Sequence, residues 1–232
     1  MRFLPLVSSR EEASRWRAFP DLELLWEGGA GTEWATAVRG GQAVHGLHFR
    51  PQEWKAGLLE EVMEALRPGL GTDFLVLPAD PPATRWGLSG FLGTLETLLE
   101  ATAGRGLRLA LRAAPGRVPR LLDILREVRG DAVGFCWDET VGESLEAIAD
   151  RLHCAVGRPG MDARPLQHWG YRWNMAIPGK DPELLLSQVQ ALRSVHPAVL
   201  FPAEMPATAL GRPVVEDPEV SLGRPWRGEL PG

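Results

Sequence analysis

LRLALRAAP at residues 107–115 and AVGFCWDE at residues 132–139 are the two stretches that decide the fold of this chain. Each is a short apolar run that ends at a charged residue, Arg112 in the first and Asp138 in the second. Between them, residues 117–129 carry apolar side chains at helical spacing. A strand, a helix and a second strand in this order form a unit in which the two strands are parallel.

The same alternation runs through most of the chain. Eight β/α units close naturally into a barrel, whereas an open doubly wound sheet is the alternative. The sequence VSSR at residues 7–10 follows the first apolar run and is not a glycine-rich dinucleotide loop, which favours the barrel. The predicted strands cover residues 3–7, 22–26, 44–49, 74–77, 107–111, 132–137, 152–156 and 198–201, and the predicted helices cover residues 54–66, 92–101, 121–128, 144–152 and 182–195.

Residue parity along the two central strands also favours a barrel. If Arg112 and Asp138 point inward, the small residues Ala110, Gly134 and Cys136 do too, and the bulky residues between them face outward. Small residues inside and large residues outside suit a tight barrel under a ring of helices. We therefore predict an α/β fold, a (β/α)8 TIM barrel over residues 1–204, without a regular eighth helix.

The end of the chain departs from this pattern. Residues 205–232 are rich in Pro and Gly, and no helical pattern follows the predicted eighth strand. We expect an extended tail that runs over the barrel or onto a neighbouring subunit, where it would form a homodimer. A disordered tail is the alternative.

Composition excludes several classes of function. The net charge of −5 offers no basic face to nucleic acid. The apolar runs fall short of the roughly 18 residues that span a bilayer, and Pro5 interrupts an N-terminal run too short for a signal peptide. Cys136 and Cys154 both lie in predicted strands, as buried reduced thiols do. We expect a cytoplasmic protein that contacts neither nucleic acid nor membrane.

Chemistry in a barrel of this kind lies at the carboxyl ends of the strands. The segment at residues 157–178 follows the predicted seventh strand, and its aromatic and hydrogen-bonding side chains are suited to covering a ligand. Packing of its tryptophans on the barrel rim is the alternative. The candidates at the strand ends are Glu27, His48, Arg50, Arg112, Asp138, Arg158 and Glu204, and the segment adds Tyr171, Arg172 and Asn174.

The two opening stretches resemble strands five and six of the xylose-isomerase-like TIM barrels, the sugar-phosphate isomerase/epimerase family. In that family the fifth strand ends in a metal-binding Glu and the sixth in a metal-binding Asp. Here the Asp is Asp138, whereas Arg112 takes the place of the Glu. The resemblance also matches His48 to a third-strand His, and it makes Glu204 the candidate for the eighth-strand metal Glu.

Other metal positions of the family also differ in this chain. Pro78 ends the fourth strand, where the family has His, and Ala155 takes the place of the seventh-strand His. A guanidinium about 4 Å from a divalent ion would cost on the order of 8 kcal/mol at an effective dielectric of about 20. Arg stays protonated and cannot relieve that cost. The resemblance therefore implies a barrel that has lost its divalent cofactor, with Arg112 between Asp138 and Glu204.

Three functions remain open from the sequence. The first is a non-catalytic barrel, which binds a small polyol or an anion at its mouth without metal-dependent catalysis or serves as a subunit of a larger assembly. The second is an isomerase or epimerase of a sugar or sugar phosphate, with Glu27, Asp138 and Glu204 as bases and Arg112 as the electrophile. The third is an unrelated activity on the same fold. In each, the remaining candidates bind the ligand: His48, Arg50, Arg158, Tyr171, Arg172 and Asn174.

Overall fold

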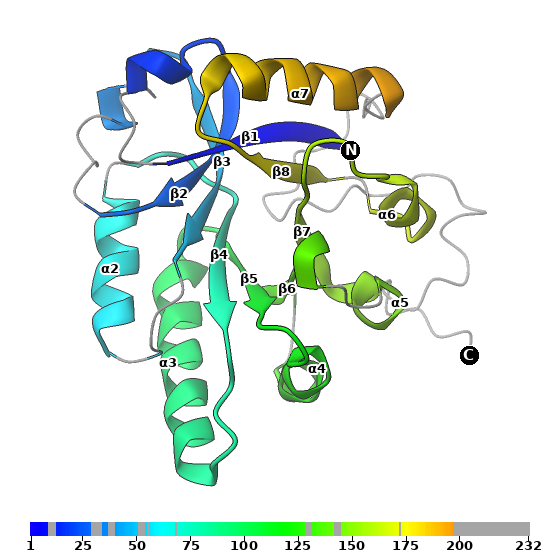
Figure 1. The fold of residues 1–232 in the computed structure, drawn as a ribbon. Coiled ribbons are helices and arrows are strands. Elements are labelled where there is room, and N and C mark those ends of the chain that lie inside the picture. Colours follow the sequence, from blue (N-terminus) through cyan, green and yellow to red (C-terminus); the bar gives the residue numbers. More distant parts are fainter. Residues whose placement is uncertain are drawn as a thin grey trace, which may run out of the picture.

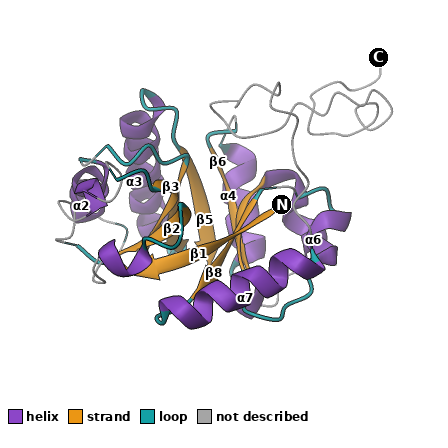
Figure 2. Ribbon diagram, turned by 90° about the horizontal axis from the view of Figure 1, so that it is seen from above, coloured by secondary structure: helices purple, strands orange, loops and turns teal. Residues whose placement is uncertain are grey.

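The chain closes into a barrel of eight parallel strands that are neighbours in chain order, with β1 beside β8 (Figure 1). The computed structural model describes residues 1–8, 13–28, 34–36, 40–50, 54, 56–67, 69–128, 131–141, 145–171 and 173–196. Seen from above, the helices lie outside the strands (Figure 2). The predicted (β/α)8 barrel is confirmed.

The elements alternate along the chain as parallel pairing requires. The strands are β1 Arg2–Ser8, β2 Asp21–Trp26, β3 Ala43–Phe49, β4 Phe74–Ala79, β5 Arg108–Ala113, β6 Val133–Asp138, β7 Leu152–Val156 and β8 Asn174–Pro178. The helices are α2 Ala56–Leu66, α3 Arg85–Ala103, α4 Val118–Glu127, α5 Leu145–Ile148, α6 Arg164–His168 and α7 Pro182–Val195, with single turns of 3-10 helix at η1 Ala13–Trp16, η2 Glu139–Val141 and η3 Ala149–Arg151. None of these helices combines the length and the apolar character needed to cross a bilayer.

The position of the eighth strand corrects the sequence prediction. Asn174–Pro178 closes the barrel against β1, whereas the predicted strand at residues 198–201 lies outside the described residues. The predicted helix at residues 182–195 is confirmed as α7, but it follows β8, so the expectation that no regular helix follows the last strand is wrong. Because α6 has only five residues and β8 another five, the whole unit resembled one long loop in the sequence.

The core has two layers, which follow the predicted parity. Leu109, Leu111 and Phe135 belong to the large layer between strands and helices. Ala110 and Cys136 belong to the small cluster inside the barrel. The inner cluster consists of Leu6, Phe74, Val76, Ala110, Cys136, Cys154, Val156 and Ala176. Both cysteines are buried and free, and burial raises the pKa of the Cys154 thiol well above its ordinary value.

Two glycines make room for large rings in the amino-terminal part of the barrel. A Cβ atom at Gly46 would collide with the ring of Phe74, and one at Gly134 would collide with the ring of His153 and the carbonyl of Arg151. His153 is the extra residue where the register of β6 and β7 shifts, between the pairs Phe135 with Leu152 and Cys136 with Cys154. The amino-terminal part of the barrel is therefore filled by these rings.

Tyr171 makes a buried hydrogen bond at the start of β8, beside the seam between β7 and β8. Only two residue pairs join these strands, Ala155 with Met175 and Val156 with Ala176. The buried Tyr171 hydroxyl donates to the carbonyl oxygen of Asn174, the first residue of β8. Burial and the neighbouring thiols raise the pKa of Tyr171 well above its usual value, although the Ala155 backbone amide lowers it. The hydroxyl therefore remains a donor.

A second side chain joins strands at the amino-terminal end. His45 is the extra residue where the register of β2 and β3 shifts. Its ring nitrogens contact Asp21 Oδ1 at 2.8 Å and Asp73 Oδ2 at 3.3 Å, which links β2, β3 and the residue before β4. Burial is the largest influence and opposes the charged form, but the hydrogen bonds with Asp73 and Asp21 outweigh it and raise the pKa of His45.

Tyr171→Phe should lower the free energy of unfolding by about 1 to 3 kcal/mol, because it leaves a buried carbonyl without its donor. Ser187→Ala is the matched control, since it removes an exposed hydroxyl that donates to its own helix. Its effect should stay within about 0.5 kcal/mol. Urea unfolding of the two variants measures both values, and equal effects would show that this hydrogen bond does not stabilise the fold.

His45→Gln should flatten the pH dependence of stability. Because the folded pKa of His45 is raised, its contribution is full below the unfolded value of about 6.5 and is lost as pH rises through the folded pKa. Thermal unfolding from pH 5.5 to pH 8 should therefore show a loss in the wild type that the variant lacks. His168→Gln is the control, because His168 is exposed and contacts the ring of Trp169. An unchanged slope in His45→Gln contradicts the assignment.

Candidate functional site

The carboxyl ends of the strands bring arginine and carboxylate side chains together around the barrel mouth. Each of the four pairs described there joins neighbouring strands or the loops after them. One of the pairs, Arg112 with Asp138, joins residues of the strands themselves. The pairs are Glu27 with Arg50, Asp80 with Arg117, Arg112 with Asp138, and Glu139 with Arg158.

Arg112 and Asp138 form the pair above the barrel interior. Arg112 Nη1 lies 3.9 Å from Asp138 Oδ2, and the two side chains are 22% and 15% exposed. That separation is an ion-pair distance but too long for a hydrogen bond. The other carboxylate oxygen, Oδ1, accepts hydrogen bonds from the Thr140 amide at 2.9 Å and the Thr140 hydroxyl at 2.6 Å. Asp138 is therefore fixed on one side, and its second oxygen lies near the Arg112 guanidinium.

Glu27 lies at the end of β2 and is held from two sides. It accepts hydrogen bonds from the Ser8 hydroxyl and from Arg50 Nη2. Its side chain is 3% exposed, whereas that of Arg50 is 56% exposed. The carboxylate is thus covered by the arginine. The structure brings Glu27, Arg50, Arg112 and Asp138 to one end of the barrel, as the sequence predicted.

The two remaining pairs lie further out. Arg158 Nε is 3.2 Å from Glu139, and Arg117 Nε is 2.9 Å from Asp80 Oδ1. Arg158 is mostly exposed, and exposed pairs of this kind contribute little to stability. Arg158 therefore lies at the exposed rim of the barrel.

His48 lies deeper than the predicted mouth position. The His48 and Glu23 side chains are both fully buried, and His48 Nε2 lies 2.5 Å from Glu23 Oε2. Glu23 was not among the predicted site residues, although a carboxylate inside the apolar strand DLELLW was a signal. A His facing inward from β3 needed a polar neighbour, and β2 supplies it.

Two of the predicted ligand contacts, Tyr171 and Asn174, lie away from the mouth. Asn174 begins β8 and accepts a hydrogen bond at 3.0 Å from Arg2 at the start of β1, so it lies at the amino-terminal end of the barrel. Tyr171 precedes it and is buried, so neither side chain lies at the predicted mouth position. Arg172 and Glu204 lie outside the described residues, and Pro178, not Glu204, ends the eighth strand.

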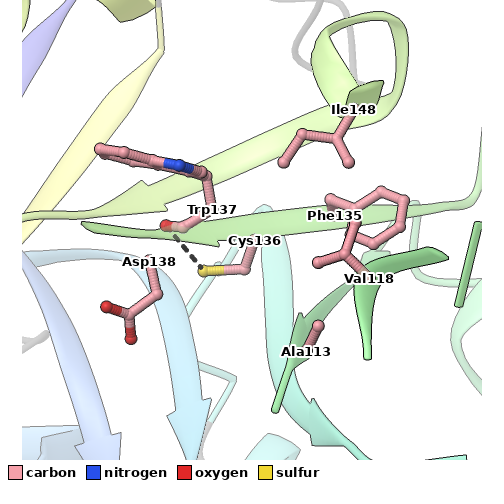
Figure 3. A pocket seen from close by; sticks show the side chains of 7 residues that line it. All are labelled: Ala113, Val118, Phe135, Cys136, Trp137, Asp138 and Ile148. Carbon is pink, nitrogen blue, oxygen red and sulfur yellow. Dashed lines mark hydrogen bonds between the residues drawn. The ribbon is translucent and has the colours of Figure 1, made fainter. Parts of the chain in front are cut away.

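A small, open and shallow hollow adjoins Asp138 beside β6. Figure 3 shows Val118, Phe135 and Ile148 gathered on one side, with the Asp138 carboxylate apart from them. Cys136 Sγ lies 3.8 Å from the Trp137 carbonyl oxygen along the same strand. The lining residues are Ala113, Val118, Phe135, Cys136, Trp137, Asp138 and Ile148. The hollow is mainly apolar, so the polar chemistry of this end belongs to the mouth.

Within the described part of the chain, no three His, Cys, Asp or Glu side chains are arranged to hold a metal ion. The mouth instead offers guanidinium donors beside carboxylate acceptors. Such pairs can bind hydroxyl groups through both partners, or an anion through the guanidinium.

No protein-family model matches the chain, and no curated protein matches it in sequence. Solved structures do match. A xylose isomerase domain protein from Planctomyces limnophilus superposes with a TM-score of 0.63 at 13% identity, over 84% of this chain and 94% of that one. The 3-keto-D-glucoside 4-epimerase YcjR from E. coli, in its apo form, superposes with a TM-score of 0.63 at 14% identity, over 84% of this chain and 99% of that one.

A D-tagatose 3-epimerase-like protein gives a TM-score of 0.62 at 15% identity, over 84% of this chain and 96% of that one. The match thus extends over nearly the whole length of each of these structures. At such low identity the likeness establishes the fold. The chain therefore has the barrel fold of xylose isomerase-like domain proteins and sugar epimerases.

Proposed function

We propose that the barrel mouth binds a small polyol or a small anion without a divalent metal, and that the protein lacks metal-dependent catalysis. One observation carries this proposal, the 3.9 Å separation of Arg112 Nη1 and Asp138 Oδ2 at the barrel mouth. Arg112 places a permanent positive charge where a divalent cation would need another ligand.

The side chains around Asp138 do not fit a divalent cation. A hard cation needs several oxygen or imidazole ligands in its first coordination shell. The inward-facing residues at the ends of β4, β7 and β8 are Pro78, Val156 and Pro178, none of which has a ligand atom in its side chain. Asp138 Oδ1 is already engaged with Thr140. A bound cation would also lie beside the Arg112 guanidinium.

The same side chains suit a ligand with hydroxyl groups or a single negative charge. A polyol can donate to Asp138 Oδ2 and accept from Arg112, which are too far apart to satisfy each other fully. An anion can take the place of Asp138 as the partner of the guanidinium. Arg50 and Glu27 offer a second pair across the mouth.

A second candidate function is isomerisation or epimerisation of a sugar or sugar phosphate. Glu27 follows β2 and Asp138 ends β6, and these strands are four apart in the ring of eight. Proton transfer next to a carbonyl needs an acid or base on each face of the substrate and an electrophile for the enediolate. Glu27, Asp138 and Arg112 supply these three kinds of group. Two of the similar structures are named as an epimerase and an epimerase-like protein.

Arg112→Met should weaken binding at the mouth by at least about tenfold, or about 1.4 kcal/mol. Titration calorimetry with a neutral ketohexose and with inorganic phosphate measures the loss. Arg126→Met is the matched control, because Arg126 pairs with Asp123 on the outside of α4. Equal affinity in wild type and Arg112→Met contradicts the proposal. Exchange of solvent deuterium into the ketohexose would instead favour the isomerase.

Arg112→Glu should create affinity for Mn²⁺, because it places a second carboxylate beside Asp138 and removes the opposing charge. The wild type should bind Mn²⁺ at least tenfold more weakly in the same titration. Arg112→Gln separates the two effects, since it removes the charge without adding a ligand. Stoichiometric Mn or Zn in wild-type protein purified without chelator would overturn the metal-free site.

A further inference from the structure

The two cysteines of the chain lie side by side inside the barrel. Cys136 of β6 and Cys154 of β7 are Cα partners in the register of these neighbouring parallel strands. Both belong to the inner apolar cluster, so both side chains point into the barrel. The sequence contains no other cysteine. Strand pairing thus brings every thiol of the protein to one place, and the function proposed for the mouth uses neither of them.

The two thiols contact each other and are shielded from water. Cys136 is 3% exposed, Cys154 is 0% exposed, and both are free. Burial is the largest cause that raises the pKa of Cys154, and the hydrogen bond between the two thiols raises it further. Two adjacent thiols can release their protons together when a metal ion binds to the resulting thiolates.

The spacing of β6 and β7 suits a metal ion between the two sulfur atoms. Neighbouring strands lie about 4.8 Å apart, and paired side chains of parallel strands leave the backbone in the same direction. Two metal–sulfur bonds in a straight line, each about 2.3 Å long as found for zinc, span about 4.6 Å. A disulfide would need Cβ atoms about 3.8 Å apart. A bridging ion therefore requires less movement of the strands than a disulfide does.

The number of available ligands selects the kind of ion. Thiolates favour Cu(I), zinc and iron–sulfur clusters. Structural zinc takes four ligands, and an iron–sulfur cluster takes four cysteines. In the part of the chain that the structure describes, no His, Asp or Glu joins the two cysteines in a group of three that could hold a metal ion. Cu(I) remains, because two thiolates in a line satisfy its coordination.

The charges around the pair also suit a monovalent ion. Two thiolates and one Cu(I) ion carry one net negative charge, which is costly in an apolar interior without a positive charge nearby. The charge of Arg112 acts on Cys154 and lowers its pKa, in opposition to the charge of Glu23. Cys136 also lines the open hollow beside Asp138 (Figure 3), so the approach to the pair lies on this side.

We propose that Cys136 and Cys154 form a buried site for one Cu(I) ion, which is held between the two sulfur atoms. Binding releases both thiol protons to solvent and leaves the oxidation states of copper and sulfur unchanged. The site is separate from the polyol or anion site at the mouth, because that site uses side-chain nitrogen and oxygen atoms.

Anaerobic titration of the 232-residue chain with Cu(I), in competition with the chelator bicinchoninate, tests the site. The wild type should bind one ion. Cys136→Ser and Cys154→Ser should each weaken binding at least about a hundredfold, or about 2.8 kcal/mol, because one thiolate cannot bridge the ion. Met161→Leu is the matched control, since it removes a buried sulfur atom near Gly157 and keeps both thiols. Unchanged affinity in either cysteine variant, or an equal loss in Met161→Leu, overturns the proposal.

X-ray absorption at the copper edge of the Cu(I)-loaded wild type gives a second test, which does not depend on the variants folding. A shell of two sulfur atoms around the ion, without nitrogen or oxygen atoms, is the expected result. Nitrogen or oxygen ligands overturn the proposal, because they would place the ion at a histidine or a carboxylate.

Discussion

The pairing of β1 with β8 is the constraint on which the rest of the structure depends. Five residue pairs, from Arg2 with Asn174 to Leu6 with Pro178, close the sheet. A closed sheet fixes which side chains point inward, and it brings residues from strands far apart in sequence to one end. Without closure, Glu27 and Asp138 would belong to separate parts of an open sheet. With it, they stand on opposite sides of one mouth.

Seven of the eight strands could be predicted because their signals are local. Each is an apolar run followed by helical spacing or by turn residues, as the stretches at residues 107–115 and 132–139 illustrate. β8 could not be found in the same way. It has five residues, it follows the five-residue helix α6, and its hydrophobic pattern is no stronger than that of residues 198–201. Only the requirement that a strand pair with β1 identifies it.

The residues of the candidate site divide in the same way, into those placed by local sequence signals and those placed by strand pairing. Arg112 and Asp138 could be placed together because they end consecutive strands, and parallel neighbours align their carboxyl ends. Tyr171 and Asn174 were placed at the wrong end because that placement depended on where β8 begins. Glu23 was missed because its importance lies in a partner, His48, that faces it across the β2–β3 pair. Which side chain on a neighbouring strand a buried residue contacts cannot be read from the sequence of either strand alone.

Arg112 gives the barrel mouth a positive charge that does not depend on a bound ion. The positive charge that it carries is covalently part of β5, and a guanidinium keeps its proton at any physiological pH. Its presence does not vary with the supply of ions around the protein, and a chelator cannot remove it. When trace metals are scarce, this end of the barrel would therefore carry the same positive charge in every molecule of the protein.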